Sequence, residues 1–221
     1  MQHAIVVVGG SPPDARVAAG MAGAGRPGAR LVVAADSGYD HARRLGLTVD
    51  VLVGDLDSIS AVGLAHARAS GVRIEEHRPD KDATDTELAL AAAVAAGATR
   101  ITLLAGATSD RFDHSLAVVL ALGHPRLAGL EVDAWFGTTA VHALHGPCER
   151  ALPMRVDEVV SLLAVGGPAA GITTAGLRYP LVGEPLGPTS SRGVSNVAID
   201  PLPTITVQAG CLLVIRPEAL S

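Results

Sequence analysis

Short aliphatic runs alternate with segments of helical character through the first 125 or so residues of this 221-residue chain. Gly46, Gly71 and Gly97 each follow a helical segment, where glycine commonly ends a helix. This alternation predicts an α/β region, a mostly parallel sheet with helices on its faces. Strands are expected at 4–8, 30–35, 50–53, 72–75, 100–104, 130–135 and 140–144, and helices at 14–22, 39–45, 61–69, 84–96 and 115–122.

The pattern changes near Gly146 and Pro147, after which no helical periodicity is found. Strands are expected there at 159–165, 171–174, 204–208 and 211–215, with glycine and proline between them. The second part therefore predicts a small antiparallel sheet or all-β sandwich. We place the domains at 1–146, the α/β domain, and 147–221, the β-sandwich domain. A domain as small as the second has a marginal core and needs support from the first domain or from a second copy.

Composition excludes several classes of partner. Only 2% of the residues are aromatic while 48% are hydrophobic, so the core must be aliphatic. A net charge of −5 argues against a nucleic-acid backbone as the main partner. The longest strongly apolar stretch, 88–96, is far shorter than the ~20 residues that span a bilayer, so no membrane partner is expected. Cys148 and Cys211 lack CxxC spacing and are interpreted as reduced packing residues of a cytoplasmic protein. The N-terminus has no basic region and is not interpreted as a signal peptide.

Two acidic stretches carry most of the chemical information. GDLDSI, residues 54–59, contains Asp55 and Asp57, and PDKDATDTE, residues 79–87, contains Asp80, Asp82 and Asp85. Carboxylates this close repel one another unless a cation neutralises them, and hard cations such as Mg²⁺ prefer oxygen ligands. A site for magnesium and a polyphosphate is the functional interpretation. The alternatives are a local turn for the first stretch and an acidic helix N-terminus for the second.

The second stretch also marks the start of a helix. Thr84 and Glu87 have the spacing of a capping box, which predicts a helix that begins at Thr84. Asp85 then lies in the first turn, where the helix dipole favours negative charge. Lys81, between the acidic residues, is well placed to contact phosphate.

Other polar groups follow strands and are expected at the same edge of the sheet, where ligands bind in folds of this kind. Asp36 follows the second strand, and GATSDRFDH, residues 106–114, follows the fifth. This loop can offer backbone N–H groups to an anion, and Arg111 adds a guanidinium suited to phosphate. Asp113 is either the N-cap of the next helix or a nucleotide contact. The histidines show no metal-ligand spacing, so no zinc site is expected.

A D-x-D after a hydrophobic strand is also how phosphatases of the haloacid dehalogenase type begin. Asp55 would then be a nucleophile, and Thr or Val is expected at the position that Ile59 occupies. Ile59 therefore argues against this alternative.

Taken together and in order, several segments resemble those of the thiamine pyrophosphokinase family, from about residue 4 to 215. The segments are AADSGYDHA, GDLDSI, PDKDATDTELAL, GATSDRFDH, TTAGLRYPL and GVSN. The resemblance implies an N-terminal α/β domain, a C-terminal β-sandwich and a homodimer. It implies Mg²⁺-dependent transfer of a diphosphoryl group from ATP to thiamine, which gives thiamine diphosphate and AMP.

The resemblance also assigns residues. Catalytic roles fall to Asp55, Asp57, Asp82 and Asp85, of which Asp55, Asp57 and Asp85 would bind the metal. Contacts with ATP fall to Asp36, Lys81, Gly106, Thr108, Arg111 and Asp113. Contacts with thiamine fall to Thr173, Tyr179, Ser195 and Asn196, with Tyr179 as a stacking aromatic. From the chemistry of the transfer, a carboxylate is expected to accept the proton of the attacking hydroxyl, and Asp82 and Asp85 are equal candidates.

The sequence departs from the family pattern at Ser109 and Asp110, where two glycines are expected. Two alternatives follow from such departures. One is a related pyrophosphokinase that acts on another hydroxymethyl heterocycle, such as a pterin. The other is a non-catalytic module that binds nucleotide or thiamine.

Overall fold

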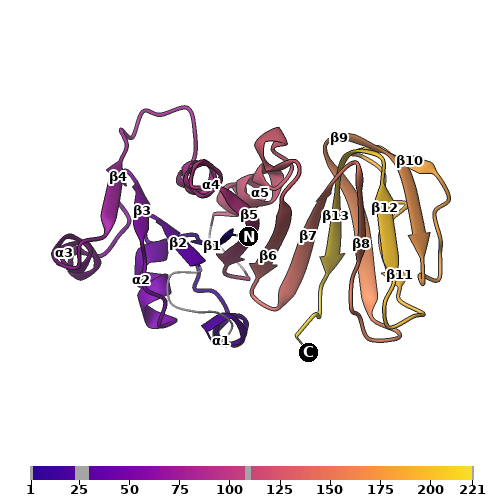
Figure 1. Ribbon diagram of the computed structural model, residues 1–221, viewed down its shortest axis with the longest axis horizontal. Helices are drawn as coiled ribbons and strands as arrows, with labels where there is room; N and C mark the ends of the chain where they lie inside the picture. The colour runs from indigo at the N-terminus through magenta and orange to yellow at the C-terminus, as the bar shows by residue number, and fades with distance from the viewer. Residues whose placement is uncertain (1, 23–29, 108–110, 221) are drawn as a thin grey trace. The chain divides into compact units, whose positions relative to one another are not determined.

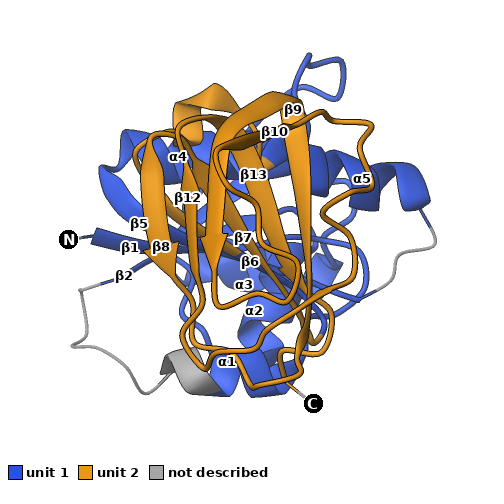
Figure 2. Ribbon diagram, turned by 90° about the vertical axis from the view of Figure 1, so that its right-hand side faces the viewer, with its two compact units in different colours: residues 1–121, 134–137 blue, residues 122–133, 138–221 orange. Residues whose placement is uncertain are grey.

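The computed structural model describes residues 2–22, 30–107 and 111–220. The chain forms two compact units, which Figure 2 distinguishes by colour. Unit 1 comprises residues 1–121 and 134–137, and unit 2 comprises residues 122–133 and 138–221. Among the described residues, no helix has both the length and the apolar character needed to cross a bilayer.

Unit 1 contains a parallel sheet in the strand order β4-β3-β2-β1-β5. Every neighbouring pair in this order is parallel, as the alternating sequence pattern predicted. The strands are β1 (Gln2–Val7), β2 (Arg30–Ala35), β3 (Val51–Gly54), β4 (Arg73–Glu76) and β5 (Ala98–Ala105).

Helices lie on both faces of this sheet. Figure 1 shows α4 and α5 on one face and α1 and α2 on the other. The helices are α1 (Ala15–Ala22), α2 (Gly38–Arg44), α3 (Ala61–Ala69), α4 (Asp85–Ala95) and α5 (Phe112–Ala121). The α/β architecture expected from the sequence is confirmed.

The central strands of unit 1 are covered on both faces, so their aliphatic side chains form a buried core. Ile5, Leu52 and Ile101, from β1, β3 and β5, have no exposed surface. Burial of each such side chain stabilises the fold by about 1.5–3 kcal/mol. Tyr39 is a fully buried aromatic residue, and its hydroxyl lies 2.9 Å from Nδ1 of His66, which satisfies the one polar atom on its ring.

Unit 2 is rich in antiparallel strands, in the order β7-β13-β9-β12-β8, with β10 and β11 also paired to β9. The strands are β7 (Thr139–His145), β8 (Cys148–Ala151), β9 (Val159–Ala175), β10 (Glu184–Leu186), β11 (Asn196–Val197), β12 (Thr204–Val207) and β13 (Ala209–Arg216). Strand β6 (Glu131–Phe136) has residues in both units, and a short 3-10 helix spans Pro125–Leu127.

Aliphatic side chains from β7, β9, β12 and β13 pack into one cluster in unit 2. Leu144, Leu162, Ile205 and Leu212 belong to it and are almost fully buried. Along β12 the buried Ile205 and Val207 alternate with partly exposed threonines, the period of two that a strand with one covered face requires. The predicted β-sandwich character of the C-terminal part is confirmed.

Strand β9 differs from the prediction, which placed two separate strands at 159–165 and 171–174. The structure has one continuous 17-residue strand. Its first half pairs with β13 and its second half with β12 and β10. Gly166 and Gly167 have φ values of 72° and 154°, which residues with side chains rarely adopt, so they let the strand bend without ending.

Two further boundaries differ. Helix α5 begins at Phe112, whereas the sequence predicted a loop through residue 113. Strand β7 pairs with β13 and belongs to unit 2, although the expected boundary at residue 146 assigns it to the first domain. The division of function at residue 146 stays a prediction.

Candidate active site

Three carboxylates meet where two neighbouring strands end. Asp36 follows β2, and Asp55 and Asp57 follow β3, which lies beside it. The Asp36 backbone N–H donates to the Val53 carbonyl at 2.9 Å, which fixes the two strand ends together. One carboxylate oxygen from each of the three residues lies within 4.8 Å of the others. The predicted gathering of these residues at one edge is therefore confirmed.

Asp36 is the buried member of this group, with 6% of its surface exposed. Its Oδ2 accepts a hydrogen bond of 2.7 Å from Ser58 Oγ, while its buried Oδ1 accepts none from any described residue. Burial raises the pKa of Asp36 above its ordinary value. Ser58 opposes this shift, and Asp85, Asp55 and Asp57 add to it. A buried carboxylate oxygen with no hydrogen-bond partner is a group that a bound cation would satisfy.

Gly54 leaves room for the carboxylates. Its φ is 150°, and a Cβ atom there would lie 3.2 Å from both Asp36 Oδ1 and Asp85 Oδ1. Leu56, with φ 65°, then turns the chain, and the Asp57 N–H lies 3.4 Å from Asp55 Oδ1. The first acidic stretch is thus both a turn and part of a carboxylate cluster.

Helix α4 supplies a fourth carboxylate. Thr84 is its N-cap, and its Oγ1 accepts from the Glu87 N–H at 3.2 Å. Glu87 Oε2 in turn accepts from the Thr84 N–H at 2.9 Å, which completes the predicted capping box. Asp85 is therefore the first helical residue, held on a capped helix end.

Lys81 bridges two of the carboxylates. Its Nζ lies 2.8 Å from Asp85 Oδ1 and 3.3 Å from Asp55 Oδ2. The contact between Lys81 Nζ and Asp85 Oδ1 is an ion pair, but its angles do not meet those of a hydrogen bond. Burial acts against the charge on Lys81, but Asp85 and Asp55 outweigh it and raise the pKa of the ammonium. Burial likewise disfavours ionisation of Asp55, but the Asp57 N–H and Lys81 outweigh it and lower the pKa of Asp55.

The other acidic residues of the second stretch lie outside this bridge. Asp80 forms an exposed ion pair of 2.8 Å with Arg78. Asp82 is exposed in the loop before Thr84. Among the described residues, the group with oxygens within 4.8 Å includes neither Asp82 nor Asp85. The structure therefore brings Asp85 to the cluster through Lys81 and leaves Asp82 exposed.

The loop at residues 106–114, the third segment predicted to bind ATP, is described only in part. Thr108, Ser109 and Asp110 lie outside the described residues. Gly106 passes so close to Ser11 that a Cβ atom there would meet the Ser11 backbone.

Arg111 and Asp113, at the end of this loop, form a two-contact ion pair at 3.0 and 2.7 Å. Arg111 lowers the pKa of Asp113 to about 2. Asp113 lies within the first turn of α5, so its interpretation as an N-cap is wrong.

The residues assigned to thiamine lie in unit 2. Asn196 is buried and holds the backbone of Tyr179 from both sides. Its Oδ1 accepts from the Tyr179 N–H at 3.0 Å, and its Nδ2 donates to the Tyr179 carbonyl at 2.7 Å. The side chain of Tyr179 remains 64% exposed. Asn196 thus fixes the backbone of a residue whose aromatic ring is exposed.

Thr173 and Ser195 are both exposed. Thr173 Oγ1 accepts from the Gly183 N–H at 3.0 Å, and Ser195, with φ 58°, donates its N–H to Ser161 Oγ at 3.1 Å.

Sequence reasoning did not assign roles in the site to Ser58 and Gly54. Ser58 belongs to the stretch for which a local turn was the alternative interpretation, yet it bonds Asp36 across 22 positions. Its place directly after D-x-D was the only available signal, since the partner becomes visible only when β2 and β3 pair.

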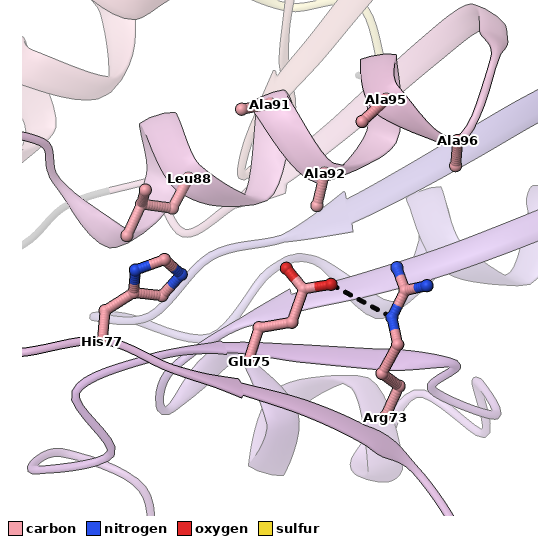
Figure 3. Close-up of a pocket in the computed structure, with 8 residues that line it drawn as sticks. All are labelled: Arg73, Glu75, His77, Leu88, Ala91, Ala92, Ala95 and Ala96. Carbon is pink, nitrogen blue, oxygen red and sulfur yellow. Dashed lines mark ion pairs between the residues drawn. The ribbon is translucent and has the colours of Figure 1, made fainter.

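A pocket of about 420 Å³ lies away from these residues, between β4 and α4. Figure 3 shows Arg73, Glu75 and His77 facing Leu88 and a row of alanines on the helix. None of the residues predicted for the site lines it. Helix α4 packs mainly against β2 and β3, and the pocket lies between this helix and the outer strand β4.

Comparison with known proteins gives two family matches. Residues 27–132 match the family described as thiamin pyrophosphokinase, catalytic domain. Residues 150–212 match thiamin pyrophosphokinase, vitamin B1 binding domain. Comparison with curated protein sequences finds no match.

Solved structures are also similar over nearly the full chain. A thiamine pyrophosphokinase from Bacillus subtilis has a TM-score of 0.80 and 21% identity, covering 99% of this chain and 100% of that chain. One from Geobacillus thermodenitrificans has a TM-score of 0.77 and 26% identity, covering 100% and 99%. One from Candida albicans has a TM-score of 0.76 and 12% identity, covering 98% and 89%.

The chain has an α/β unit with carboxylates at its strand ends and a second, strand-rich unit. Together with the family and structural matches, these features define a transferase of the kinase class. The chain belongs to the thiamine pyrophosphokinase family.

Proposed function

We propose that this chain transfers a diphosphoryl group from ATP to the hydroxyl of thiamine in a Mg²⁺-dependent reaction, which gives thiamine diphosphate and AMP. The proposal rests on one observation: the carboxylates of Asp36, Asp55 and Asp57 form a cluster at the strand ends of a chain in this family.

The donor atoms fit Mg²⁺. They are carboxylate oxygens, the hard ligands that this ion prefers, and the buried Asp36 Oδ1 has no hydrogen-bond partner among the described residues. Asp55, Asp57 and Asp85 would hold the ion, with Asp36 beside them. When bound, it would neutralise charge on the phosphates of ATP.

The remaining ATP contacts are proposed for the residues assigned from the sequence. Lys81 and Arg111 supply positive charge for phosphate oxygens. Gly106 lets the chain pass close to Ser11, where a Cβ atom would not fit. Thr108 and Asp113 complete the proposed nucleotide contacts.

Diphosphoryl transfer needs placement of the hydroxyl in line with the β-phosphorus and stabilisation of charge, with little covalent chemistry from the protein. Asp85 sits on a capped helix and Asp82 on an exposed loop, and either takes the hydroxyl proton in this proposal. Tyr179 stacks on thiamine, with Thr173, Ser195 and Asn196 around it.

The proposed enzyme works as a cytoplasmic homodimer. Two free thiols, Cys148 and Cys211, support a reducing compartment. The family resemblance supports the dimer.

The test is incubation with thiamine, ATP and Mg²⁺, with AMP and thiamine diphosphate measured by chromatography. We expect both products in equal amounts, and a loss of at least 100-fold in rate for Asp55→Asn. ADP in place of AMP, or full activity in Asp55→Asn, would contradict the proposal. A pterin alcohol offered in place of thiamine tests the acceptor.

A further inference from the structure

Lys81 is the only lysine in the chain, in which the other sixteen basic residues of seventeen are arginines. It lies at the carboxylate cluster and only 15% of its side chain is exposed. An ammonium is a compact point charge on a flexible stem, whereas a guanidinium is a wide planar fork. The only lysine ammonium of this sequence is therefore placed between two acidic groups.

Of the two carboxylates that Lys81 contacts, one is on a helix and the other lies directly after a strand. Asp55 directly follows β3, and Asp85 is the first residue of the capped helix α4. Lys81 itself lies in the loop between β4 and α4, outside any helix or strand. Of the three charged groups, the ammonium is the one that can move away without disturbing the sheet or the helix.

The contacts also define which space the ammonium fills. Nζ is within ion-pair distance of both Asp55 and Asp85, at 3.3 and 2.8 Å. A second cation that binds these two carboxylates together needs the same space, and two positive charges that close repel each other strongly. Lys81 and a divalent cation therefore exclude each other from this position.

We propose that Lys81 is an internal counter-ion that neutralises Asp55 and Asp85 until a divalent cation displaces it. The lysine then has two successive positions, the first between the carboxylates and the second outside them, where its ammonium is free to contact an anion such as phosphate. The inference rests on the proposed function because it takes Asp55 and Asp85 as metal ligands.

The first test measures binding of Mn²⁺ alone, without nucleotide, from the electron paramagnetic resonance signal of the free ion. Lys81→Met removes the competing charge and keeps much of the stem, so we expect Mn²⁺ to bind about tenfold more tightly. Arg78→Met is the matched control, because Arg78 has the same charge in the same loop but pairs with Asp80 at the surface. We expect it to bind Mn²⁺ within about twofold of the unaltered chain.

The outcomes separate the inference from the proposed function. Equal or weaker Mn²⁺ binding by Lys81→Met would overturn the counter-ion role and leave the metal site intact. Mn²⁺ binding that Asp55→Asn leaves unchanged, or no binding by any variant, would overturn the metal site and the inference together.

A second test uses the unaltered chain. Since it has one lysine, an amine-acylating reagent followed by mass spectrometry reports on Lys81 without interference from other lysines. We expect Mg²⁺ to speed acylation several-fold, because an ammonium displaced from between two carboxylates is more exposed to the reagent. Sodium chloride at the same ionic strength should not do so. An acylation rate that Mg²⁺ leaves unchanged would overturn the inference.

Discussion

Ser58 Oγ donates a hydrogen bond of 2.7 Å to Asp36 Oδ2 and so ties the loop after β3 to the end of β2. Among the described contacts of Asp36, it is the one that favours the ionised form, since burial and the neighbouring carboxylates all favour the neutral form. The charge of the most buried carboxylate in the cluster therefore depends on a single hydroxyl.

Ser58→Ala should raise the pKa of Asp36 further. The folded pKa already exceeds the ordinary 3.8, so the stabilising contribution of Asp36 is fully present below that value and is lost as pH rises through the folded pKa. In Ser58→Ala this loss should extend to higher pH, and about 1–2 kcal/mol of the free energy of unfolding should be lost at neutral pH. Denaturant unfolding in EDTA between pH 4 and 8 measures both effects.

The matched control is Ser60→Ala, which removes the N-cap of α3 and a bond to Asp40. It should lower stability by about 1 kcal/mol at every pH in that range. If the free energy of unfolding changes with pH in the same way in both variants, Ser58 does not control the charge of Asp36.

Gly54→Ala should both destabilise the fold and weaken metal binding. Its φ of 150° disfavours a side chain, and the new Cβ would press on Asp36 and Asp85 from 3.2 Å. We expect a loss of about 1–3 kcal/mol in the free energy of unfolding and several-fold weaker Mn²⁺ binding. Gly71→Ala is the control, because it has a positive φ but no described atom within 4 Å of its Cβ. It should lower stability and leave Mn²⁺ binding unchanged.

Thr84→Ala should loosen the start of α4, where Asp85 is held. Loss of this N-cap lowers stability by about 1 kcal/mol, and we expect weaker Mn²⁺ binding with it. Thr84→Ser retains the hydroxyl that the Glu87 N–H requires and should restore both properties. If Thr84→Ala matches the unaltered chain in both measurements, the cap does not position Asp85.

Glu158 should give unit 2 a specific sensitivity to acid. Its side chain is 1% exposed and accepts from Arg216 Nε at 2.6 Å. Burial disfavours its ionisation, but Arg216 and the Arg155 N–H outweigh this and lower the pKa below 4.5. The stabilisation is therefore present above pH 4.5 and is lost as pH falls through the folded pKa.

Arg216→Met leaves this buried charge without its main partner and should lower the free energy of unfolding by about 3–5 kcal/mol. The double variant Glu158→Leu with Arg216→Met should recover much of that loss and lose the acid sensitivity. Thermal unfolding between pH 3 and 7 measures the stability of each variant. If the double variant still loses stability at low pH as the unaltered chain does, Glu158 is not the source of the acid sensitivity.

Tyr179→Ala should raise the KM for thiamine about tenfold, since stacking of an aromatic ring on a cation contributes about 0.5–2 kcal/mol. The KM for ATP and the midpoint of unfolding should stay as they are, because the ring is exposed. Tyr179→Phe should keep the thiamine KM. Val182→Ala, at another exposed residue of the same unit, is the control.

Local interactions made parts of the site predictable. The start of α4 follows from Thr84 and Glu87, which bond each other within four residues, so the sequence contains both partners. The carboxylate edge follows from the parallel sheet, because the ends of neighbouring strands must meet.

The remaining features depend on contacts between distant residues. Lys81 reaches Asp55 across 26 positions, and Ser58 reaches Asp36 across 22. The sequence around each shows only its local turn. The continuity of β9 was also missed, because two glycines and a proline usually separate strands, whereas here strands on either side hold the bend in place.

Strand β13 follows every other strand of unit 2 in the sequence but lies inside their order, between β7 and β9. During synthesis, β7 and β9 emerge from the ribosome long before the strand that must fill the place between them. The unit therefore cannot close its sheet until residue 216 has left the exit tunnel. The five parallel strands of unit 1 are complete by residue 105 and can pair earlier. A nascent chain thus carries an open pair of β edges from the emergence of β9 until that of β13, the interval in which chaperone binding matters most.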